Sequence, residues 1–414
     1  MKKWLTTMCL LFILQSLIPP HSGTCQDMSR EEIIKEIMSL KNRITMLEEQ
    51  LGPEEVKEET KAEEKRPFHS VKGLAQRLSK VEDELKEKRL LGKWAERIQL
   101  SGLVEVEASY EKVDYKDPAI RDEDSSDIAL ATVELGVDVE LSRHVKGHVL
   151  FLWEEDSTEP VEVDEAFIAF SGTDKLPHYL NAGRMYVPFG RFESHLVSDP
   201  LTLQLGETRE SAVLGCFRSD WLELSLGVFN GDIDKTGTDN HIGSYVGSAL
   251  FTLPKEIISG LDFSGGVSFL SNIADSNGLQ EVGTGVSGPT LQEHISGFSA
   301  FLSASFMNRF CLEAEYLGAT ERFKPGELNF DGGQALKPKA WNSEVAYKVT
   351  EGLEFAVRYE GSDDCGNFLP KEQYGGALIY RLLENTSLGF EFLHGKFEND
   401  DKRDLLTVQV GTEF

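Results

Sequence analysis

Polar and apolar residues alternate along most of the chain after residue 98. In the first such segment Leu100, Val104 and Val106 fall on one face, and Glu105 and Glu107 fall on the other. This period of two predicts β-strands, because successive side chains of a strand point to opposite faces of a sheet. The predicted strands are residues 98–110, 129–141, 145–153, 161–171, 178–187, 211–218, 221–230, 242–253, 260–271, 294–306, 309–320, 340–349, 352–361, 373–382, 386–396 and 404–414.

The connections between these sixteen predicted strands alternate between long and short. The odd connections are long or charged: 111–127, 154–160, 188–210, 231–241, 272–293, 321–339, 362–372 and 397–403. The even connections are tight: 142–143, 172–177, 219–220, 254–259, 307–308, 350–351 and 383–385. Short turns at one end and long loops at the other are typical of bacterial outer-membrane barrels with both termini in the periplasm.

The final segment supports the same fold. Leu406, Val408 and Val410 share one face, and the strand finishes on an aromatic residue, Phe414. We expect it to close the barrel between strands 386–396 and 98–110, with Phe414 at the inner membrane boundary. A soluble β-sandwich would also alternate, but it accounts less well for the series of hairpins and the terminal aromatic. The predicted fold is all-β: a 16-stranded antiparallel transmembrane β-barrel over residues 98–414, wide enough for an aqueous lumen.

The amino terminus reads as an export signal. Lys2 and Lys3 precede an apolar run over residues 4–18, followed by small residues. The run is shorter than the roughly 20 residues of a membrane-spanning helix, which is the alternative interpretation. We assign residues 1–25 to a signal peptide, and lipidation of Cys25 remains a further option.

Residues 26–97 change the period from two to that of a helix. One apolar seam with spacing 4-3-4-3-4 comprises Ile33, Ile37, Leu40, Ile44, Leu47 and Leu51, and a second runs from Val71 to Leu85. Such seams predict a periplasmic coiled coil joined by a charged linker, which would associate protomers into a homo-oligomer. The alternative is a hairpin of two amphipathic helices within one chain.

Charge separates the two regions. Residues 1–97 carry a net charge of +1, whereas residues 98–414 carry −29. An acidic barrel excludes nucleic acid as a partner, because phosphate binding needs a basic face. Some of the acidic residues belong to predicted outer loops, where divalent ions could bridge them to lipopolysaccharide. The five cysteines show no spacing of a metal site or a disulfide framework.

No motif indicates an enzyme. The string Gly283–Gly288 matches a dinucleotide fingerprint, but it lies in a predicted loop without the strand and helix that such a site needs. His144 and His148 share a strand face with no serine placed to meet them. We therefore expect no catalytic residue, cofactor or resident metal.

The third long connection, 188–210, carries the strongest local signal. It combines charges of both signs with Leu201, Leu203 and Leu205. A loop this apolar is expected to fold into the barrel, pack its leucines on the wall and narrow the pore with its charges. The alternative is packing over the rim or at a protomer interface. The candidate binding or constriction residues are Arg184, Arg191, Glu193, His195, Asp199, Glu207, Arg209 and Glu210.

Two segments around this loop, AGRMYVPFG (182–190) and SDPLTLQLGETRES (198–211), resemble the LbtU-type siderophore porins. Together with the order of signal, coiled coil and acidic barrel, the resemblance implies an outer-membrane protein associated with uptake of the siderophore legiobactin. Its expected partners are outer-membrane lipid, lipopolysaccharide and a small solute.

The function expected first is therefore a channel or receptor for a ferric siderophore or a similar small polar solute. A general cation-preferring diffusion porin is the alternative, and a structural envelope anchor that uses the coiled coil is a third. The net charge of the barrel opposes an anionic carboxylate siderophore, so the charge of the solute stays open.

Overall fold

The computed structural model describes residues 97–414, apart from 156–157, 173–176, 238–240, 284–289 and 331. The expected signal peptide, the coiled coil up to residue 96 and most of the Gly283–Gly288 string lie outside these residues. Within the described part, no helix has the length and apolar character needed to cross a membrane.

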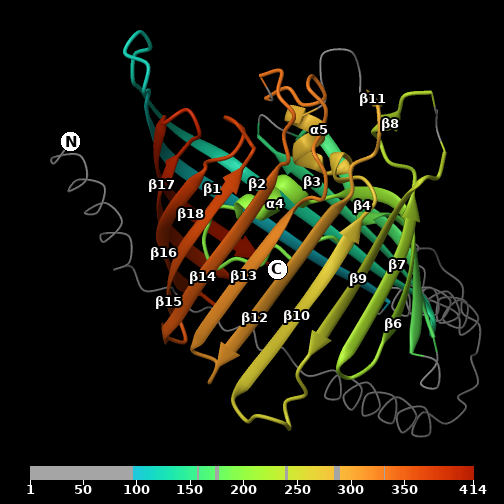
Figure 1. Cartoon of the computed structure of the whole chain (residues 1–414). Coiled ribbons are helices and arrows are strands. Elements are labelled where there is room, and N and C mark those ends of the chain that lie inside the picture. The colour runs from blue at the N-terminus through green and yellow to red at the C-terminus, as the bar shows by residue number, and fades with distance from the viewer. Residues whose placement is uncertain (1–96, 156–157, 173–176, 238–240, 284–289, 331) are drawn as a thin grey trace, which may run out of the picture. The chain divides into compact units, whose positions relative to one another are not determined.

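Sixteen antiparallel strands form one closed barrel (Figure 1), which confirms the predicted fold. Each strand pairs with its sequence neighbours among the barrel strands, and β18 closes on β1. The barrel strands are β1(Ile98–Asp114), β2(Glu123–Ser142), β3(Val145–Glu154), β4(Thr158–Ser171), β5(His178–Tyr186), β6(Arg209–Arg218), β7(Leu222–Phe229), β9(Ser244–Thr252), β10(Leu261–Leu270), β12(Gly297–Phe306), β13(Phe310–Ala319), β14(Lys339–Thr350), β15(Leu353–Asp363), β16(Glu372–Leu383), β17(Thr386–Lys396) and β18(Lys402–Glu413).

The carboxyl terminus closes the barrel as predicted. β18 pairs with β17 on one side and with β1 on the other, with Val410 opposite Val106. Beyond the strand, Gly102 and Phe414 exchange two backbone hydrogen bonds of 3.1 Å. A Cβ atom at Gly102 would lie 2.3 Å from the Phe414 ring, so any larger residue at this position would displace the ring.

The two faces of the barrel differ in polarity. On β15, Phe355, Val357 and Tyr359 are between 43 and 51% exposed, whereas the alternate residues Arg358 and Glu360 are buried. An apolar outer face of this extent is stable in lipid, and the polar inner face suits a hydrated lumen. The chain therefore spans a membrane as a barrel, with its outer face in contact with lipid.

The hairpin of β1 and β2 is longer than the sequence pattern predicts. Residues 111–114 and 123–127 were expected in a loop, but they continue the ladder, with Lys112 opposite Asp124 and Tyr110 opposite Ser126. The hairpin projects beyond its neighbours in Figure 1. The sequence pattern misses these parts of the strands because they are rich in acidic residues and have no apolar face. A strand needs an apolar face only where it meets lipid or a core.

Two other long connections also carry short elements. Connection 231–241 contributes β8(Asp234–Lys235), which pairs in parallel with β11(Thr290–Leu291) of connection 272–293. The latter connection also forms a 3₁₀ turn, η1(Ile273–Asp275), and α5(Asn277–Gly283). Period-based prediction misses such short elements because they are too short for an apolar period to repeat often enough to be recognised.

Candidate functional site

Residues 187–208, which connect β5 to β6, are called the inner loop here. In Figure 1 the loop and its helix α4(Leu201–Gly206) lie within the ring of strands. Leu201 and Leu205 are fully buried and belong to one apolar cluster with Leu317 of β13. The leucines hold the helix against the inner wall because burying each removes apolar surface from water, worth about 2 kcal/mol.

A carboxylate of the barrel wall holds the start of the inner loop. Glu315 on β13 accepts hydrogen bonds from the backbone N–H groups of Arg191 (2.8 Å) and Phe192 (3.0 Å), and from the Thr202 hydroxyl (3.3 Å). Phe192 has φ 60°, a rare backbone conformation for a residue with a side chain. One buried carboxylate therefore fixes two successive backbone amides of the inner loop.

Two further carboxylates hold the middle of the inner loop. Glu391 on β17 accepts from the backbone N–H groups of Val197 (2.8 Å) and Ser198 (3.1 Å), and from the Ser198 hydroxyl. Glu360 on β15 accepts from the backbone N–H of Leu201 at 2.8 Å, at the start of α4. A carboxylate here also complements the positive end of the helix.

A buried arginine links the wall to the loop. The Arg358 guanidinium lies between Glu344 (3.0 Å) and Glu360 (3.5 Å), and all three side chains are fully buried. It also donates to the Ser194 hydroxyl and to the backbone carbonyl of Asp199 (3.4 Å). One cation thus partly compensates two buried carboxylates while binding the loop.

His195 adds a titratable contact. Its Nδ1 lies 2.7 Å from a Glu354 carboxylate oxygen, and its backbone N–H donates to Glu344. The hydrogen bond to Glu354 raises the pKa of the His195 imidazole, which favours the charged ring.

Glu207 lies where a second outer connection covers the inner loop. The Asn277 backbone N–H donates to the Glu207 carbonyl (2.8 Å), and the Asn277 amide lies 3.3 Å from its carboxylate. A Cβ atom at Gly278 would lie 1.9 Å from the Gln204 carbonyl, so α5 approaches α4 closely. Burial, reinforced by the nearby charge of Asp199, raises the pKa of Glu207 to about 7.

The structure brings most candidate residues to the inner loop. Arg191 pairs with Glu193 (2.5 Å) and donates to Ser264 on β10 (2.9 Å). Its guanidinium lies 5.5 Å from the Phe301 ring centroid. Asp199 faces open lumen space, although enclosure by the wall and the charges of Glu154 and Glu391 raise its pKa against the effect of Arg358.

The remaining three candidates lie on strands. Arg209 at the start of β6 pairs with Asp164 and, at 3.6 Å, with Glu162 on β4. Glu210 is buried on the same strand. Arg184 is exposed on β5 and directly precedes the buried Met185. It shares the outer face of the strand with exposed Leu180, away from the loop anchors.

The wall formed by β1 and β2, next to β18, is different. The inner-face carboxylates Glu105 and Glu107 of β1 and Glu134 of β2 form no hydrogen bond or ion pair with the inner loop among the described residues. Glu107 instead accepts from Gln409 of β18 at 2.8 Å. We call these three the β1–β2 carboxylates. They leave negative charge on the side of the lumen that the loop does not cover.

Sequence reasoning did not identify the anchors Glu315, Glu344, Arg358, Glu360 and Glu391. Alternation placed several of these on polar strand faces, which is the signal that could have found them. Their selection from many similar inner residues depends on where the loop folds.

The described residues offer no resident metal site. No group of three or more histidine, cysteine or acidic side chains in the described ranges is arranged to hold a metal ion. Cys216, Cys311 and Cys365 are buried free thiols. Burial raises the pKa of the Cys365 thiol to about 12, so this group stays protonated and inert.

The fold and the inner loop define a porin-type outer-membrane β-barrel. The structure resembles the outer membrane channel DcaP of Acinetobacter baumannii, with a TM-score of 0.50 and 15% identity over 77% of this chain and 97% of that chain. It also resembles the anion-selective porin from Comamonas acidovorans, with a TM-score of 0.52 and 13% identity over 77% and 99% of the two chains. At these identities the likeness concerns the fold.

In sequence the chain is a distant homologue of UPF0422 proteins. It is 26% identical to one from Legionella pneumophila (strain Lens) over 325 residues, 72% of this chain and 58% of that protein. It is 25% identical to one from Coxiella burnetii (strain RSA 493 / Nine Mile phase I) over 282 residues, 65% and 59% of the two chains. The chain thus spans a little under three-fifths of these relatives. No protein-family model matches it.

Proposed function

We propose that the protein is a passive outer-membrane channel for small polar solutes, narrowed by the inner loop and selective for cations. The observation that carries the proposal is the loop itself, bound along the wall from β10 to β17 and not to the β1–β2 carboxylates. This arrangement leaves a route for solute between the loop and that wall. The channel needs no enzyme chemistry, because diffusion through the hydrated lumen moves the solute.

The cation preference follows from charge on both sides of the route. Glu105 and Glu107 line one side, and Asp199 and Glu207 belong to the loop on the other. Fixed charges between low-dielectric walls act strongly on a passing ion, so carboxylates raise the local concentration of cations.

Planar-bilayer recording tests the proposal. The purified protein in a KCl gradient should give a stepwise ohmic current whose reversal potential is shifted towards the equilibrium potential of K⁺. Arg191→Ala and Glu207→Ala should change selectivity or single-channel current, whereas Asp122→Ala on the projecting hairpin should not. Absence of any current would instead favour the structural anchor. If only Asp122→Ala changed the current, the inner loop would not line the pore.

A ferric siderophore is the second candidate solute. The segment that carries the resemblance to LbtU-type porins, 198–211, forms part of the inner loop and the start of β6. The acidic lumen favours a neutral or cationic ferric complex over an anionic carboxylate. Iron uptake from defined ferric siderophores, compared in cells with and without the protein, tests this. Equal uptake in both strains for every siderophore would remove the candidate while leaving the channel intact.

A further inference from the structure

A cavity of about 490 Å³ opens on the inner face near the end of the barrel that carries the short turns. It is built from the ends of β14 and β16 and the starts of β15 and β17, together with Glu413 of β18. Its lining includes the turns at 351–352 and 384–385. This is the end opposite to the long outer loops, so a solute would reach it after passing the inner loop.

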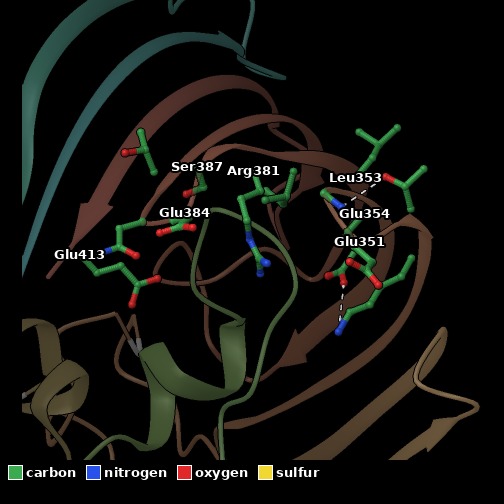
Figure 2. A pocket seen from close by; sticks show the side chains of 13 residues that line it. Glu351, Leu353, Glu354, Arg381, Glu384, Ser387 and Glu413 are labelled. Carbon is green, nitrogen blue, oxygen red and sulfur yellow. Dashed lines mark hydrogen bonds and ion pairs between the residues drawn. The ribbon is translucent and has the colours of Figure 1, made fainter. Parts of the chain in front are cut away.

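An arginine lies in the middle of this cavity. In Figure 2 the Arg381 side chain extends between Glu384, Ser387 and Glu413 on one side and Glu351 and Glu354 on the other. Its backbone N–H donates to the Gly352 carbonyl at 2.8 Å, which fixes the strand beneath it. Its guanidinium is exposed and forms no hydrogen bond or ion pair with any described residue. The group is therefore free to bind a solute.

The carboxylates around Arg381 are of two kinds. Glu354 is already compensated, since it contacts His195 at 2.7 Å and Lys348 at 3.9 Å. Within the described part of the chain, Glu351, Glu384 and Glu413 form no ion pair. The cavity thus presents one free cation flanked by free anions.

We propose that this cavity, called here the Arg381 site, binds an amphoteric solute that carries one carboxylate and at least one amine or guanidine, as a basic amino acid does. The inference rests on the proposed channel function and names a solute class for it. The planar guanidinium of Arg381 matches a carboxylate in a two-bonded geometry. The cationic end of the solute then lies towards Glu384 and Glu413 or towards Glu351.

The pairing of charges explains why neither a simple anion nor a simple cation fits as well. An anion without an amine would meet the uncompensated carboxylates, which repel it. A cation without a carboxylate would leave Arg381 unpaired and would be repelled by it. An amphoteric solute satisfies both sets, and it exchanges water contacts for charge-assisted hydrogen bonds.

Current block in planar bilayers tests the Arg381 site with L-arginine and agmatine, which differ by the carboxylate. Added from the side of the short turns, arginine should block wild type at a lower concentration than agmatine, despite the larger positive charge of agmatine. The measured quantity is the ratio of the blocking concentration of agmatine to that of arginine. In Arg381→Ala this ratio should fall about tenfold, as expected for one lost charge-assisted contact. Arg218→Ala removes another arginine from the same end of the barrel, where it pairs with Glu223 at 2.6 Å, and should leave the ratio unchanged.

Each result bears on the proposal separately from channel function. A cation-selective wild-type current that arginine blocks no better than agmatine overturns the Arg381 site and leaves the channel standing. An unchanged ratio in Arg381→Ala, or an equal loss in Arg218→Ala, also overturns it. Arginine methyl ester supplies a test without mutation: it should behave like agmatine in wild type. Absence of any wild-type current contradicts the channel itself.

Discussion

The two sides of the lumen hold their charges in different ways. On β13–β17, six inner charged residues contact the inner loop: Glu315, Glu344, Glu354, Arg358, Glu360 and Glu391. On β1 and β2, the carboxylates of Glu105, Glu107 and Glu134 form no such contact among the described residues. The same residue type, glutamate, therefore has two roles. The set on β13–β17 fixes the inner loop, and the set on β1 and β2 supplies negative charge to the water-filled route.

The comparison teaches that a carboxylate inside a barrel contributes to structure or to selectivity according to its partner. A carboxylate that accepts backbone N–H groups is expensive to remove, because those donors would remain buried without a partner. A carboxylate that faces water is cheap to neutralise, and its main effect is on ions that pass.

Arg358→Ala should produce the largest effect. It leaves Glu344 and Glu360 buried without their cation and should lower the free energy of unfolding by about 3–5 kcal/mol. We expect a lower thermal unfolding temperature of the detergent-solubilised barrel and a noisy, larger single-channel current, because the inner loop loses its central link. A variant that unfolds at the wild-type temperature with a quiet current would show that Arg358 is not what binds loop to wall.

Glu315→Ala should have the next largest effect. It should lower the free energy of unfolding by about 1–3 kcal/mol, because it leaves two backbone N–H groups without an acceptor. Glu313→Ala is the matched control: this residue shares the strand and the inner face, and it binds the Ser303 hydroxyl at 2.7 Å. We expect current fluctuations to increase in the first variant and not in the second. Equal noise in both would point to lost charge and not to a released loop.

The double substitution Glu105→Gln and Glu107→Gln should leave stability close to wild type and reduce cation selectivity several-fold, because it removes two charges that the inner loop does not bind from the route. The readout is the reversal potential in a KCl gradient. Glu123→Gln and Asp124→Asn on the projecting hairpin remove the same charge outside the lumen and should change little. A comparable shift from the hairpin pair would assign selectivity to the outer rim.

The smallest expected effect is that of pH. Glu207, with a pKa of about 7, is neutral below that value and negative above it. The raised pKa of His195 keeps its ring charged to higher pH than usual, and deprotonation there removes a positive charge. Both changes make the loop more negative as pH rises, so cation selectivity should increase through pH 7. Glu207→Gln should flatten this profile, and a profile unchanged in that variant would assign the titration to another group.

Much of the barrel could be predicted from sequence because alternation reports which face meets lipid. The sixteen strands, the alternation of loops and turns, and the pairing of β18 with β1 and β17 all follow from that period and from the need to close the sheet. The β1–β2 hairpin was underestimated because its outer part leaves the membrane, where both faces can be polar.

The sequence also singled out the third long connection, because its three leucines would expose apolar surface to water if the loop stayed outside the barrel. What it determined by itself was a membrane barrel and the segment most apt to enter it. Only the tertiary structure decided which wall carboxylates the inner loop binds, that Asn277 reaches Glu207, and that Arg381 has no ion-pair partner among the described residues. These contacts join residues more than a hundred positions apart in some cases, such as Arg191 and Glu315. Local periodicity gives the direction of a side chain, whereas its partner depends on how the closed barrel and the inner loop come together in space.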